Sequence, residues 1–239
     1  MKKKILSAAL VVALIAIMVS GTLAYFTDND EVTNTFTIGS VEIEIHENGA
    51  LVEGDTLPMD DILLPVVGEN PEDAADNYGQ KQVTVMNTGN NDAYVQVFVA
   101  LPKELDDAGV IAIMDNYPDT EEYDWETYGI VGTMTDSNGL LCNVYRYDYK
   151  YPVPAGKLTK SEAIEYVYLT STTDLNVHRT EEGDVKAAYL VDEKGNELTS
   201  VDVSKGIPVY VYARAVQAEG FSDYFDALDT AFGKTLPWD

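Results

Sequence analysis

Histidine is the residue most often used for acid–base and zinc chemistry near neutral pH, and this chain has two, His46 and His178. His46 opens residues 46–50, HENGA, which begin like the H-E-x-x-H helix of zinc peptidases. Ala50 stands where the second histidine of that motif is required, and Gly49 disfavours a helix. His178, between Val177 and Arg179, is isolated and is predicted to be a surface residue. Neither histidine is therefore predicted to bind a metal.

Cys142 is the only cysteine, so the chain forms no internal disulfide and its stability must come from a packed core. Its apolar neighbours Leu140, Leu141 and Val144 predict a buried thiol rather than a nucleophile. Serine-hydrolase elbows, phosphate-binding loops and dinucleotide fingerprints are absent from the sequence. Carboxylates are so frequent that no pair singles out a glycosidase. We expect no enzymatic activity and no catalytic residue.

The acidic excess is the unusual feature of the composition, because 41 Asp and Glu stand against 15 Lys and Arg, a net charge of -26. Such a surface repels nucleic acid and anionic lipid and favours cations, basic partners and solubility. A solvated acidic surface is the preferred interpretation, and no cofactor is expected. Calcium stays an alternative for two acidic loops that lack the spacing of a calcium loop, namely Asp28, Asp30 and Glu31, and Asp119, Glu121, Glu122 and Asp124.

The N-terminal residues have the three parts of a secretory signal peptide. Residues 2–4 are lysines, residues 5–19 are apolar except for one serine, and small residues follow. Thr22 and Ala24 occupy the −3 and −1 positions of a cut between Ala24 and Tyr25. The alternative is an uncleaved membrane anchor, because the apolar stretch approaches the roughly 20 residues that span a bilayer. We expect a secreted protein that touches the membrane only through the signal segment before cleavage.

Hydrophobic periodicity predicts the elements of the mature chain. Strands are predicted over residues 33–38, 41–45, 82–86, 93–101, 130–135, 140–149, 187–192, 197–203 and 207–216. Helices are predicted over residues 103–115 and 222–232, the second with Ser222 as its N-cap and Gly233 as its stop signal. Residues 159–168 fit either a short helix or a strand, and residues 55–78 fit a long loop.

One predicted strand separates its side chains sharply by type. Its face of Tyr145, Tyr147, Tyr149 and Tyr151 indicates a stripe at the edge of the core rather than a carbohydrate platform. Many short strands separated by turn residues predict a mainly β fold, an antiparallel β-sandwich with short helical insertions. We expect residues 1–24 to be removed and residues 25–239 to form a single domain.

Four segments carry a resemblance to a known family: residues 21–28, 34–43, 83–97 and 212–221. The first two fit G-T-x-A-x-F-x-D followed by F-x-x-G-x-[VL]-x-[VIL], and the chain thereby resembles the TasA and camelysin (CalY) family. The resemblance implies a jelly roll, a SipW-type signal peptidase as processing partner, and secretion to the cell surface or the extracellular matrix of a Gram-positive-type bacterium. Camelysin-type relatives have been described as metalloproteases, but no residues here are predicted to carry that activity.

The mature N-terminus is the predicted assembly element. Residues 25–37 contain Tyr25, Phe26, Val32 and Phe36, which gain from burial, and an extended segment can add a strand to a neighbour's sheet. The resemblance implies biofilm fibres made by such strand donation, with further copies and other matrix proteins as partners. The alternative is that residues 32–38 are the first strand of their own sheet. A monomeric surface module that binds a cation, a glycan or a host protein is the second interpretation, and a secreted hydrolase is the weakest.

Overall fold

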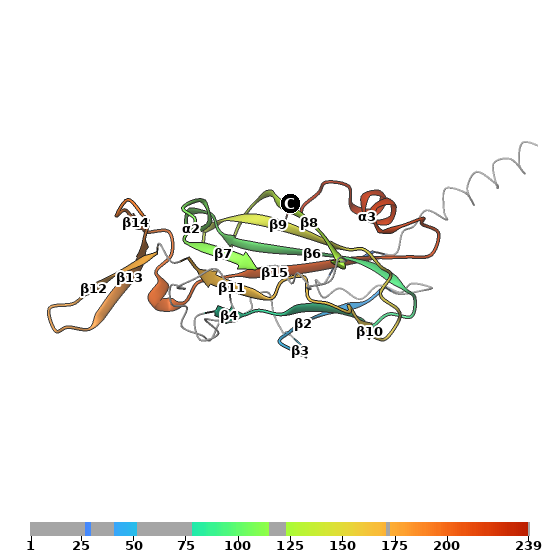
Figure 1. The fold of residues 1–239 in the computed structure, drawn as a ribbon, viewed down its shortest axis with the longest axis horizontal. Helices are drawn as coiled ribbons and strands as arrows, with labels where there is room; N and C mark the ends of the chain where they lie inside the picture. Colours follow the sequence, from blue (N-terminus) through green and yellow to red (C-terminus); the bar gives the residue numbers. More distant parts are fainter. Residues whose placement is uncertain (1–26, 30–40, 52–77, 115–122, 171–172, 239) are drawn as a thin grey trace, which may run out of the picture.

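The structure, a computed structural model, describes residues 27–29, 41–51, 78–114, 123–170 and 173–238. It confirms a mainly β protein built from several antiparallel sheets, consistent with a β-sandwich (Figure 1). The strands of the first half are β1 (Thr27–Asn29), β2 (Ile43–Glu47), β3 (Ala50–Leu51), β4 (Tyr78–Gln80), β5 (Val83–Asn87), β6 (Ala93–Pro102), β7 (Ile111–Met114) and β8 (Trp125–Thr135). Those of the second half are β9 (Leu141–Tyr149), β10 (Lys157–Leu158), β11 (Tyr166–Leu169), β12 (Asp174–Arg179), β13 (Val185–Val191), β14 (Glu197–Leu198) and β15 (Tyr210–Gln217). The helices are α2 (Lys103–Asp107), the short 3₁₀ turn η3 (Val203–Lys205) and α3 (Tyr224–Phe232).

The largest sheet has five strands in the order β1-β15-β6-β9-β8, all paired antiparallel. Its central strand β6 is buried along its whole length, on both faces of the sheet. Val95, Val97 and Val99 point into the main core, whereas Phe98 and Ala100 point to the opposite, outer face. A strand buried on both sides needs apolar residues without alternation, which explains the continuous apolar run.

Two smaller sheets, β10-β5-β2-β3 and β4-β11-β7, form the second layer. The main core lies between the layers and joins residues of both, such as Ile43 and Val85 from the small sheets with Val97 and Tyr147 from the large one. Tyr147 and Tyr149 are almost fully buried there and Tyr145 packs against this core, whereas Tyr151 is 36% exposed, so the predicted tyrosine stripe lies at the edge of the core. Packing between two sheet faces is the defining feature of a β-sandwich.

The third small sheet, β12-β13-β14, projects from one end of the molecule as an arm (Figure 1). Its first strand is exposed at five of six positions. The turn of residues 192–196, where β13 leads into β14, shares its chemistry with the turn of residues 136–140, between β8 and β9. In each, one aspartate, Asp136 or Asp192, accepts bonds from backbone N–H groups two and four residues later. Both turns lie between strands that the sequence predicted, residues 130–135 and 140–149, and residues 187–192 and 197–203.

Several predicted elements have different bounds or types. The helix predicted over residues 103–115 is wrong beyond Asp107, because residues 111–114 form strand β7 against β11. Residues 159–168 form no helix, and their end enters strand β11. Helix α3 is capped by Asp223, whose carboxylate accepts the N–H of Asp226, and not by Ser222. Strand β12 was not predicted. Most of the predicted loop over residues 55–78 lies outside the described residues.

Candidate assembly site

Strand β1 lies at one edge of the large sheet, against β15. Thr27 pairs with Val216, Asp28 with Ala215 and Asn29 with Arg214. These three residues belong to the segment 25–37 that was predicted to donate a strand. In the single chain β1 therefore covers the edge of its own sheet. The other residues of the prediction lie outside the described ones: Ala24 and Tyr25 of the cleavage site, and Phe26, Val32 and Phe36 of the assembly strand.

The opposite edge of the same sheet is strand β8, and it is irregular. Its pairing with β9 shifts between Thr127 and Ile130 and again between Ile130 and Gly132. Gly129 takes a positive φ of 64° inside the first bulge, a backbone conformation that favours glycine. Bulges on an edge strand oppose the addition of another strand. The two edges thus differ, because only the β15 edge has regular geometry for a further strand.

The outer face of the large sheet is covered by the C-terminal segment, α3 and residues 233–238. Helix α3 buries Ala227 and Leu228 against Tyr94 and Val216. Beyond it, the ring of Trp238 lies edge-on to Phe98, with centroids 6.2 Å apart, and 5.7 Å from the ring of Tyr212. These aromatic contacts bury a face that would otherwise expose a large apolar surface.

Arg214 connects β15 to this cover. It is only 4% exposed, and its Nε donates to Oε1 of Gln96 at 2.7 Å while Nη2 donates to the carbonyl of Thr235 at 3.0 Å. The guanidinium carbon lies 4.8 Å from the ring centre of Phe98 and 4.2 Å from that of Phe232. Burial, together with the repulsion of Arg146, lowers the pKa of Arg214 to about 10.

Asp148 is the anion of this buried cluster and has no solvent-exposed surface. Its Oδ1 accepts from Nε2 of Gln96 at 2.7 Å and from Nε of Arg146 at 2.9 Å, and its Oδ2 accepts from Nη2 of Arg146 at 2.5 Å. Although burial opposes it, the hydrogen bond and charge of Asp148 raise the pKa of Arg146. The ring of Tyr128 covers Arg146 at 4.4 Å. This cluster was not predicted from the sequence, where its signal was two charged residues that alternate with tyrosines in an otherwise apolar strand.

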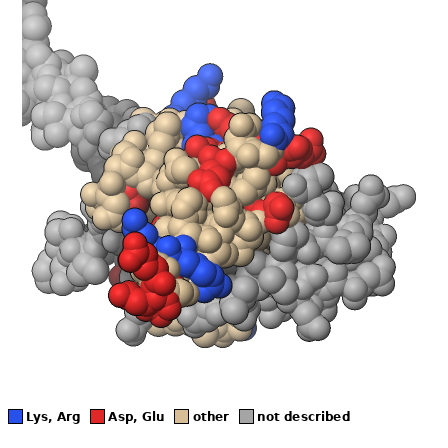
Figure 2. All heavy atoms as spheres, turned by 90° about the vertical axis from the view of Figure 1, so that its left-hand side faces the viewer, with Lys and Arg blue, Asp and Glu red and all other residues tan. Residues whose placement is uncertain are grey.

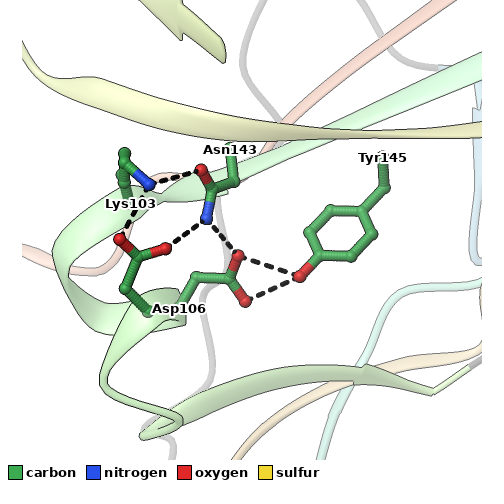
Figure 3. A network of polar contacts seen from close by, with 5 residues as sticks. Lys103, Asp106, Asn143 and Tyr145 are labelled. Atoms are coloured by element: carbon green, nitrogen blue, oxygen red, sulfur yellow. Dashed lines mark hydrogen bonds and ion pairs between the residues drawn. The ribbon is translucent and has the colours of Figure 1, made fainter. Parts of the chain in front are cut away.

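A second polar network fastens α2 to β9 (Figure 3). Asn143 donates to carboxylate oxygens of Asp106 and Asp107 at 2.7 and 2.9 Å, and the Tyr145 hydroxyl donates to Asp106 at 2.7 Å. Nζ of Lys103 donates to Asp107 at 2.7 Å. The hydrogen bonds from Lys103 and then from Asn143 lower the pKa of Asp107. Both carboxylates face donors of their own chain, so the arrangement holds the helix in place and resembles no acid–base pair.

The comparison with protein families gives one match, because the model of the camelysin metallo-endopeptidase family matches residues 1–64. The resemblance to the TasA/camelysin family is confirmed. Neither a curated protein nor a solved structure matches the chain. The camelysin match includes β1, β2 and β3 of the described residues and ends before the strands of the large sheet other than β1.

The description of the camelysin family implies a catalytic metal, and the described residues do not fit one. His46 and His178 lie in different sheets, on β2 and β12. Among the described residues, Nε2 of His46 makes no hydrogen bond and lies 3.6 Å from a carboxylate oxygen of Glu44, while Nε2 of His178 bonds to Glu197 at 2.9 Å. No group of three His, Cys, Asp or Glu side chains in that part of the chain could hold a metal ion. No catalytic step is therefore assigned to the described residues.

The remaining sequence candidates are dispersed. Of the two acidic loops, Asp30, Glu31, Asp119, Glu121 and Glu122 lie outside the described residues, and Asp124 accepts the hydroxyl of Ser161. Cys142 is buried as predicted, and burial raises the pKa of its thiol to about 12. Figure 2 shows small separate groups of basic and acidic side chains between other residues on the end face that carries the arm. None of the described helices is long and apolar enough to cross a membrane.

Proposed function

We propose that the chain is a secreted structural protein of a bacterial surface or extracellular matrix, which forms fibres when one copy gives its N-terminal strand to the next. The camelysin match supports a secreted, matrix-type protein. The proposed copy-to-copy contact is heterologous and does not close, and repetition of such a contact produces a filament. A SipW-type signal peptidase would free the donating strand, and other matrix proteins would join as further partners.

The position of β1 is the observation that carries this proposal. Three N-terminal residues pair with β15 at the edge of the large sheet and, among the described residues, with no other strand. The same backbone hydrogen bonds form whether the strand comes from the same copy or from a second one. Exchange of the strand between copies therefore loses few contacts. The protein concentration then determines whether β1 pairs within one copy or with a second copy.

Cysteine cross-linking separates the two arrangements. In a Cys142→Ala background of the chain that begins at Tyr25, Thr27→Cys is made in one sample and Val216→Cys in another. These positions are direct partners in an antiparallel pair, with Cα atoms about 4.5–5.5 Å apart, which suits a disulfide. The double variant Thr27→Cys/Val216→Cys measures pairing within one copy.

We expect the mixed single variants to give a disulfide-linked dimer under oxidation, increasing with concentration, while each single variant alone gives none. Electron microscopy is expected to show fibres of the unsubstituted chain, and none after deletion of residues 25–37. A link that forms only within single copies of the double variant, at every concentration, would refute exchange. It would then favour the monomeric surface module that binds a cation, a glycan or a host protein.

Peptidase activity is the second candidate, because the matching family is described as a metallo-endopeptidase. The separation of the two histidines argues against it. Hydrolysis of a denatured protein substrate, with added zinc and with a chelator, tests it directly. Cleavage that zinc restores and His46→Ala abolishes would establish an enzyme and overturn the structural role.

A further inference from the structure

We propose that residues 233–238 are a clamp that holds β15 in the shape required to pair with β1, with Thr235 and Trp238 as its positioning residues. The inference rests on the proposed strand exchange and names the part of the chain that controls it. The clamp is proposed to act on β15 and not on the incoming strand itself. It acts through the outer-face side chains of β15 that it holds.

Strand β1 and the clamp both meet Arg214 of β15. Asn29 of β1 is paired in register with Arg214, and Thr27 with Val216. Arg214 is the residue whose guanidinium donates to the carbonyl of Thr235 at 3.0 Å. The residue that pairs with the incoming strand is thus also the residue that the clamp binds.

The clamp also supplies a hydrogen-bond acceptor to the buried guanidinium of Arg214. Arg214 is almost fully buried beside a second cation, Arg146, and the single buried anion Asp148 is hydrogen-bonded to Arg146. A buried guanidinium keeps its place only if its N–H groups find acceptors. In the described residues these acceptors are Gln96 and the carbonyl of Thr235. Without the clamp, Arg214 loses one of them and is expected to turn toward water, which disturbs the edge strand.

The clamp crosses the outer face of the large sheet from β8 to β15. Trp238 contacts the rings of Tyr212 on β15 and Phe98 on β6. Leu236 lies over Gly132 of β8, so closely that a Cβ there would approach Cδ1 of Leu236 to 2.7 Å. The segment therefore spans from the bulged edge to the accepting edge. Because the clamp contacts strands at both ends of its path, it restrains the twist of the strands that it covers. The twist of β15 determines the geometry in which a further strand can pair with it.

The test uses the Thr27→Cys/Val216→Cys pair in the Cys142→Ala chain, with Trp238→Ala as the perturbation. Phe225→Ala is the matched control, because it removes an aromatic ring from the same C-terminal segment at a side chain that is 55% exposed. The first readout is the rate of disulfide formation at this pair, within and between copies. The second is hydrogen exchange of residues 210–217, compared with residues 185–191 of the arm.

We expect Trp238→Ala to slow the disulfide about five- to tenfold, as the loss of aromatic contacts of this kind implies. In Trp238→Ala, the rate of hydrogen exchange should rise in residues 210–217 and stay unchanged in residues 185–191. Phe225→Ala should change neither the disulfide rate nor the hydrogen exchange. A disulfide that forms at the unperturbed rate in Trp238→Ala would overturn the clamp, and so would an equal rise of exchange in both segments. Failure of the parent pair to form any disulfide would instead refute the pairing of β1, and with it the proposed function.

Discussion

Replacement of Asp148 by alanine tests whether the buried cluster under α3 stabilises the fold. Asp148 is fully buried and accepts three hydrogen bonds, two of them from Arg146. Removing one partner of a buried ion pair costs about 3–5 kcal/mol, because the other charge stays without compensation. The Arg146 side chain is 15% exposed and can partly rehydrate, so we expect about 3 kcal/mol, the lower end of that range.

The assay is urea unfolding followed by tryptophan fluorescence, with the melting temperature as a second measure. A loss of about 3 kcal/mol corresponds to a fall of roughly 6–12 °C for a domain of this size. Asp107→Ala is the matched control, because this aspartate also pairs with a cation, Lys103, but its side chain is 51% exposed. Its expected cost is below about 1 kcal/mol, as for other surface ion pairs.

The double replacement Arg146→Met/Asp148→Leu separates the cost of losing the Asp148 side chain from the cost of leaving the Arg146 charge buried without a partner. It removes both charges and leaves neither a buried cation without its partner nor a cavity at residue 148, so we expect it to be more stable than Asp148→Ala alone. A loss below about 1 kcal/mol for Asp148→Ala would refute the reasoning, since it would mean that the cluster is open to water. An equal loss for Asp107→Ala would refute it too, because burial would then not decide the cost.

Three further predictions follow from burial and close contact. The Cys142 thiol, buried and with its pKa raised to about 12, should not react with a disulfide reagent at pH 8 in the folded chain and should react at once in urea. Gly132→Ala should displace Leu236 and cost about 1–3 kcal/mol, with a red shift of the tryptophan emission if Trp238 follows; an unchanged spectrum and stability would contradict the contact. Burial raises the pKa of Tyr128 to about 12 from its usual 10, and that of Tyr210 is raised too, so the unfolded chain loses these protons first. The raised pKa of Cys142 acts in the same direction from its usual value of 9, so the free energy of unfolding should fall between pH 9 and 12; stability that rises in this window would show the opposite sign.

The local parts of the fold were predictable from the sequence. Alternation placed Tyr147 and Tyr149 on the core face, and the turn at Asp136 follows the predicted strand end at residue 135. Asp192, predicted as the last residue of a strand, begins the next such turn. Both features depend on neighbours within a few residues. The same is true of α3, whose apolar spacing and stop at Gly233 lie within one segment.

The incorrect and missing predictions depended on contacts between distant residues. Residues 111–114 had helical spacing, but pairing with β11, more than 50 residues later, made them a strand. Arg146 and Asp148 alternate with buried tyrosines and would face water in a one-layer sheet, yet α3 and residues 233–238 cover them. The sequence contained no local sign of that cover. For the assembly site, the sequence named residues 25–37, but the strand they meet was apparent only from the sheet order.

The double bulge of β8 has a consequence for the number of neighbours that one copy can have. A sheet with two regular edges can add strands on both sides, and its assemblies broaden into ribbons or branch. Here one edge is deformed at Gly129 and again before Gly132, so the sheet offers a single position to an incoming strand. Under the proposed strand exchange, in which each copy donates one strand, each copy would have one predecessor and one successor. The resulting polymer would be polar and of constant width, and it would lengthen only at its ends.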